Sequence, residues 1–116
     1  MAAIAGTHTL VSPNSAAANT IVWTQINQDD TGAAVVIGAP IRHGTISFQG
    51  TWDSMTQTLE GTLDGSLWVP LRDTGGAVIA ATADTSHEFR TNVLQVRIAV
   101  SGGTTSDVDV NIAYLL

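Results

Sequence analysis

The chain has 116 residues and carries ten acidic residues against four basic ones, which gives a formal net charge of −6 at pH 7. This charge excludes a nucleic-acid backbone as partner, because phosphate binding needs clustered positive charge. The length fits a single domain, and the absence of Cys removes disulfides and thiolate metal sites. The longest nearly apolar stretch, residues 33–41, is interrupted by Gly38 and Pro40 and is too short to span a bilayer, so we expect no membrane partner.

The N-terminal segment, residues 1–19, contains no Asp, Glu, Lys or Arg and shows no clear hydrophobic periodicity. It lacks the basic segment and the long apolar run of a secretion signal. Ile4, Leu10 and Val11 nevertheless give it apolar side chains to bury. We therefore predict an extended N-terminal arm over residues 1–19 and a β-sandwich domain over residues 20–116. A terminus without fixed structure is the alternative for the arm.

Two strands are predicted directly after this arm. Residues 20–26 are rich in β-branched and aromatic side chains, which favour strands. Residues 33–37 are apolar throughout and predict a strand that is buried on both faces.

Period-two alternation dominates the rest of the chain and places one set of side chains in a core and the other in water. It is found in residues 44–50, 55–63, 94–100 and 108–114. Pro70 predicts an edge strand between the second and third of these segments, because proline cannot donate to a neighbouring strand.

These segments are separated by turns rich in Gly, Asp and Ser, and together they give about eight strands and no convincing helix. We therefore predict an all-β fold, an antiparallel β-sandwich or a jelly-roll-like arrangement. The large side chains expected in its core are Trp23, Phe48, Trp52, Trp68, Phe89 and Tyr114.

No sequence motif indicates reactive chemistry. His8, His43 and His87 have no partner at metal-ligand spacing, and neither a nucleophile elbow nor a phosphate-binding loop is present. The Asp pairs at positions 29/30 and 107/109 are candidate calcium ligands, but Asp side chains in turns ordinarily accept hydrogen bonds from nearby backbone amides. We therefore expect no enzymatic activity, no bound metal and no cofactor.

Four short motifs follow one another between residues 44 and 115: Gly50-Thr51-Trp52, LEGTLDGSLW at 59–68, RDTGG at 72–76 and VSGG at 100–103. Through them the chain resembles small all-β structural proteins in the virions of tailed bacteriophages. The resemblance implies a capsid decoration protein, also called a cement protein, on the capsid exterior of a virion. It implies two partners: the major capsid protein, and further copies of the chain in a homo-oligomer, commonly a trimer.

A cement protein must add contact area between neighbouring subunits. The apolar residues of the arm are expected to pack on a neighbour or on the shell beneath. Arginine is the cation preferred at protein interfaces, so three arginines are expected to pair with acidic groups across subunits, with ordinary surface charges as the alternative. The candidate partner-binding residues are therefore Ile4, Leu10, Val11, Arg42, Arg90 and Arg97.

Other functions stay open. The turn at residues 64–66 before Trp68 also resembles the hairpin of discoidin-type and other carbohydrate-binding sandwiches, which implies a carbohydrate-binding or host-adhesion module on a tail or fibre. In such a module, exposed Trp52 or Trp68 would stack on sugar rings. A small hydrolase would need His43 or His87 in a polar cleft. Another structural position, in the tail or neck of a virion, is also compatible with the sequence.

Overall fold

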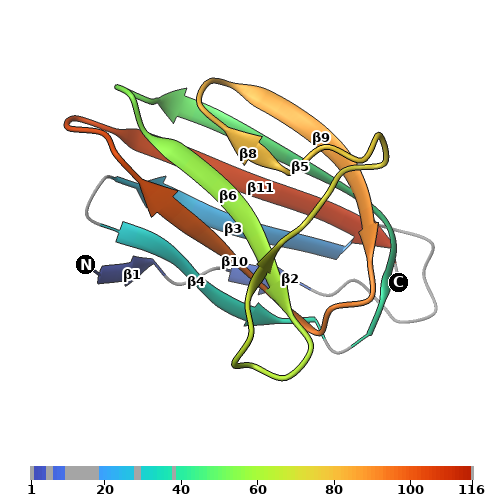
Figure 1. The fold of residues 1–116 in the computed structure, drawn as a ribbon. Coiled ribbons are helices and arrows are strands. Elements are labelled where there is room, and N and C mark those ends of the chain that lie inside the picture. The colour runs from blue at the N-terminus through green and yellow to red at the C-terminus, as the bar shows by residue number, and fades with distance from the viewer. Residues whose placement is uncertain (1, 5–6, 10–18, 28–29, 38, 116) are drawn as a thin grey trace.

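The computed structural model describes residues 2–4, 7–9, 19–27, 30–37 and 39–115, and within the first nine residues it describes the backbone alone. In these ranges every regular element is a strand, and the strands form two layered sheets (Figure 1). The described part of the chain contains no helix that is long and apolar enough to cross a membrane. The predicted all-β sandwich is therefore confirmed.

Each sheet combines strands from distant parts of the sequence. Sheet A contains, in spatial order, β1 (Ala2–Ile4), β4 (Asp30–Val36), β10 (Gln95–Ser101), β6 (Thr56–Thr62) and β7 (Val69–Pro70), with β8 (Ala80–Ala81) also paired to β6. Sheet B contains, in spatial order, β2 (Thr7–Thr9), β3 (Asn19–Ile26), β11 (Asp107–Leu115), β5 (Ile41–Thr51) and β9 (Thr85–Thr91).

The central strand of sheet B is β11. It pairs with β5 from Asp107 opposite Thr51 to Leu115 opposite His43, and with β3 on its other side. In sheet A, β10 takes the equivalent place between β6 and β4. Both central strands pair antiparallel with their neighbours, as predicted, whereas the short pair β1–β4 is parallel.

The inner faces of the two central strands form the core. Every second residue of β11 is at most 1% exposed, and the residues between them face solvent, except for partly buried Leu115 at the strand end. The buried set is Val108, Val110, Ile112 and Tyr114. From the opposite sheet, Val96 and Ile98 of β10 are fully buried. The alternation predicted for residues 108–114 is thus confirmed, and it determines which face of sheet B packs inward.

The prediction that residues 33–37 are buried on both faces is wrong. Val35 and Ile37 are each 7% exposed, but Val36 is 64% exposed and Ala34 is exposed as well. The strand β4 lies beside the short strand β1 at one side of sheet A, so its outward-pointing side chains meet solvent instead of a second layer.

The described strands of the predicted arm extend one edge of each sheet. β1 pairs with β4, with Ile4 opposite Gly32, and β2 pairs with β3. Leu10 and Val11 lie outside the described residues. The division of the chain into an arm and a domain stays a prediction.

Trp23 connects the two sheets. It belongs to β3 of sheet B and is fully buried. Its indole Nε1 donates a hydrogen bond of 3.0 Å to the carbonyl oxygen of Ala33 on β4 of sheet A. A buried indole N–H needs such a partner. The hydrogen bond therefore fixes the spacing of β3 and β4, and the indole ring fills the core between them.

Replacing Trp23 by Phe removes the indole N–H and part of the buried ring. We expect the free energy of unfolding to fall by about 2 kcal/mol, because a cavity remains and the Ala33 carbonyl loses its donor. The matched control is Trp68→Phe, at a partly exposed position, where we expect a loss below about 1 kcal/mol. Urea unfolding followed by circular dichroism measures both, and equal losses would contradict the role of Trp23 between the sheets.

Candidate interaction surface

The described residues contain no group of three or more His, Asp or Glu side chains that could hold a metal ion. His43 is exposed on β5, and His87 on β9 forms a pair with Asp73, in which Nδ1 lies 2.9 Å from Oδ2. His8 lies in β2, where only the backbone is described.

Two predicted partner-binding residues, Arg42 and Arg90, lie at the same end of sheet B. There β5 begins and β9 ends, with Ile41 opposite Thr91. The pairing of the two strands shifts register between Ile41 and Gly44, so Arg42 lies in an irregular part of β5. We call this region the arginine end.

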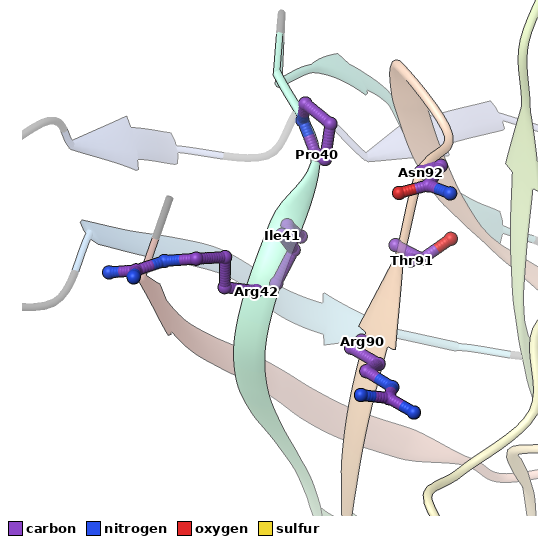
Figure 2. Close-up of a pocket in the computed structure, with 6 residues that line it drawn as sticks. All are labelled: Pro40, Ile41, Arg42, Arg90, Thr91 and Asn92. Atoms are coloured by element: carbon purple, nitrogen blue, oxygen red, sulfur yellow. The ribbon is translucent and has the colours of Figure 1, made fainter.

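The arginine end carries an open hollow of about 600 Å³. Figure 2 shows the side chains of Arg42 and Arg90 leaving neighbouring strands in different directions. Both side chains are exposed. Because the two guanidinium groups do not converge, the hollow suits a broad acidic surface better than one small anion. Its lining consists of Pro40, Ile41, Arg42, Arg90, Thr91 and Asn92.

Arg97, the third predicted arginine, lies apart from the other two, on β10 of sheet A. Its Nε donates a hydrogen bond of 2.8 Å to Oε1 of Glu60, directly opposite on β6. Its guanidinium carbon lies 4.2 Å from the centre of the Trp68 ring. Arg97 is therefore held within the chain by an ion pair and a cation–π contact.

The expectation that Trp68 is a core residue is wrong, because Trp68 is only partly buried and lies under Arg97. The other five predicted core aromatics are buried. Among them, Trp52 donates its indole Nε1 to Oδ1 of Asp84 at 2.8 Å. Neither Trp52 nor Trp68 thus presents an unobstructed ring for stacking on a sugar.

Exposed apolar side chains gather near the arginine end, but on sheet A. Leu63 and Leu67 are 67% and 69% exposed, and Val69 is 43% exposed. Together with Val93 they line an open hollow of about 200 Å³. We call Leu63, Leu67 and Val69 the apolar patch. Contiguous exposed apolar side chains are a common feature of protein–protein contacts.

The apolar patch was not among the residues predicted from the sequence, which indicated only an edge strand around Pro70 in this region. Instead, Oδ1 of Asp64 accepts hydrogen bonds from the backbone amides of Ser66 and Leu67, at 2.8 and 2.9 Å. This Asx-type turn delays the start of β7 to Val69. The Asp-Gly-Ser sequence at residues 64–66 is the signal from which the patch could have been predicted. An Asp side chain that accepts hydrogen bonds from the following amides forms a turn, and this turn places Leu63 and Leu67 on an exposed loop.

The end of sheet B opposite the arginine end is acidic. Its exposed carboxylates are Asp53, Asp84, Asp107 and Asp109. The indole of Trp52 and then the amide of Gly50 donate to Asp84 and lower the pKa of its carboxyl. The hydroxyl of Thr104 lowers the pKa of Asp53 in the same way. These hydrogen bonds favour the ionised form, so the end stays negative at neutral pH.

The acidic end also has a hollow, of about 540 Å³. All four Arg residues of the chain lie elsewhere, and the chain has no Lys. The residues that line this hollow are Thr24, Gln25, Asn27, Asp30, Ser106 and Asp107.

The loop between β7 and β8, both strands of sheet A, runs beside β9 at the edge of sheet B (Figure 1). The backbone amide of Thr74 donates to the carbonyl oxygen of Glu88 at 2.8 Å, and Asp73 pairs with His87. Asp73 also accepts from the backbone amides of Gly75 and Ala77 within its own turn. The loop therefore pairs with the outer edge of β9 at Glu88, whose carbonyl oxygen would otherwise lack a backbone donor.

No protein-family model matches the chain, and no curated protein matches it by sequence. Among solved structures, the fold is similar to that of YomS, a protein derived from the SPBc2 prophage, with a TM-score of 0.62 and 13% sequence identity. The similarity covers 92% of this chain and 100% of YomS. At this level of identity it shows a shared fold.

Weaker similarities are found to two other structures. A cupin domain from Bordetella pertussis Tohama I gives a TM-score of 0.49 at 14% identity, over 100% of this chain and 99% of that one. The pre-peptidase C-terminal domain of a collagenase from Bacillus anthracis gives 0.45 at 16% identity, over 99% and 95%. Similarities this loose carry no argument about function.

The pair between Asp73 and His87 predicts a pH dependence of stability. The hydrogen bond to His87, and then that from the Ala77 amide, lower the pKa of Asp73 in the folded state. A lowered carboxyl pKa contributes stability above the unfolded-state value of about 3.9, and this contribution is lost as the pH falls through the folded-state pKa. We therefore expect Asp73→Asn to melt below the wild type at pH 6, with the gap closing as the pH falls below the folded-state pKa. Thermal unfolding at pH 2 to 7 measures this, and a constant gap would contradict it.

Proposed function

We propose that this chain is a virion structural protein, and specifically a capsid decoration protein. In this proposal it binds the outer face of the major capsid protein shell and stabilises the shell by contacts that bridge its subunits. It acts as a homo-oligomer, a trimer by its resemblance to cement proteins, and it catalyses no reaction.

The observation that carries the proposal is the apolar patch, in which three exposed apolar side chains lie together around one open hollow. Leu63 and Leu67 are each more than two-thirds exposed and lie beside an open hollow. Burying such side chains against a partner contributes about 25 cal/mol per Å² of apolar surface, without any reacting group. A protein that attaches to a shell needs contact energy of this kind.

The wider context supports a virion role. YomS is derived from a prophage, which is compatible with a phage protein, and the motifs between residues 44 and 115 resemble those of virion proteins. The alternative of a carbohydrate-binding module is less favoured, because Trp52 is buried and hydrogen-bonded to Asp84 and because Arg97 lies over Trp68.

Binding to shells tests the proposed function. The full-length protein is mixed with capsid shells of the phage that encodes it and sedimented, and we expect saturable co-sedimentation. The double variant Leu63→Ser/Leu67→Ser should bind at least about tenfold more weakly, because it removes the apolar contact surface but alters no core residue.

The control for this experiment is Val78→Ser, which changes an exposed apolar residue, 37% exposed, outside the apolar patch. It should bind shells as the wild type does. Absence of wild-type binding would overturn the decoration role. If the control weakens binding as much as the double variant does, the apolar patch is not the shell-binding surface.

A further inference from the structure

Charge is distributed unevenly along sheet B. Arg42 and Arg90 lie at the arginine end, while Asp107 belongs to the acidic end. The distance between the ends follows from β5, which runs from Ile41 at one end to Thr51 at the other. The ten steps between these residues span roughly 33 Å. This is several times the Debye length of about 8 Å at physiological salt, so the two ends cannot neutralise each other within one chain.

Arg90 is available for an external partner. It is exposed, and among the described residues the salt bridges are those of His87 with Asp73 and of Arg97 with Glu60. The chain thus uses Arg97 internally but leaves Arg90 at the rim of an open hollow (Figure 2).

The acidic end carries the charge that complements the arginine end. Asp107 is exposed at the start of β11 and lines the second hollow together with Asp30. The two hollows are of similar size, about 600 and 540 Å³, and they carry opposite charge. Between two copies of this chain, opposite charges at the two ends favour head-to-tail contact over contact between like ends.

We propose that the partner of the arginine end is the acidic end of a second copy of this chain, with Arg90 placed against Asp107. This inference rests on the homo-oligomer in the proposed function and names its contact. The contact is heterologous, because two different surfaces of each copy take part. Each copy then offers a free arginine end and a free acidic end to further copies, so the assembly closes into a ring or continues as a filament. The apolar patch, on sheet A, takes no part in this contact.

Reversing one charge at either end tests the contact. Sedimentation velocity of the wild-type protein should show concentration-dependent association that weakens as the salt concentration is raised. Arg90→Glu and Asp107→Lys should each raise the dissociation constant at least about tenfold, because each places like charges in contact. The matched control, Arg72→Glu, changes an exposed arginine in the loop between β7 and β8 and should associate as the wild type does.

Mixing the two variants gives the decisive result. Arg90→Glu keeps its acidic end and Asp107→Lys keeps its arginine end, so one native contact can form between them. The reversed ends also complement each other. The mixture should therefore associate with an affinity close to that of the wild type, although each variant alone does not. This recovery also shows that both variants are folded.

Three results would overturn the inference: a wild-type protein that stays monomeric at high concentration, variants that associate normally, or a mixture that fails to associate. These results are separate from those for shell binding. A monomer that binds shells would remove the head-to-tail contact and leave the decoration role standing. An oligomer that does not bind shells would remove the decoration role and leave the head-to-tail contact standing.

Discussion

The whole structure depends on the burial of one face of β11 against the opposite sheet. Its four inward side chains are at most 1% exposed. The strand itself lies between β3 and β5 and pairs with β5 over nine consecutive residues. A shift of the strand by one residue would place Asp107 and Asp109 in the core, so the register of the sheet is strongly specified. Trp23 then sets the spacing of the two sheets by donating its indole N–H across to Ala33.

This frame explains why the surface features are separated. Because β5 and β11 pair along nine consecutive positions, the arginine end and the acidic end are held at opposite ends of one rigid sheet. The loop between β7 and β8 pairs with the edge of β9 at Glu88, which hinders attachment of an added strand at that position. The side-chain surfaces described above for partners are two charged ends on sheet B and the apolar patch on sheet A.

The sequence predicted those parts of the fold that local periodicity determines. The alternation of residues 108–114 identified the inward face of β11, and Pro70 correctly indicated an edge strand. Features that depend on tertiary neighbours were missed. Val36 is exposed because no layer covers its side of β4, and Trp68 lies under Arg97 because β6 brings Glu60 beside that arginine. The meeting of Arg42 and Arg90 depends on the pairing of β5 with β9, which no local pattern encodes.

Amide hydrogen exchange of the isolated protein tests the central claim about β11 most directly. Backbone amides between Val108 and Tyr114 should exchange only through global unfolding, and they should be among the slowest in the molecule. The amides of Gly75 and Ala77, held by a solvent-exposed turn, should exchange faster by local opening. Exchange in β11 as fast as in that turn would contradict the account, because the sheets would then not be organised around this strand.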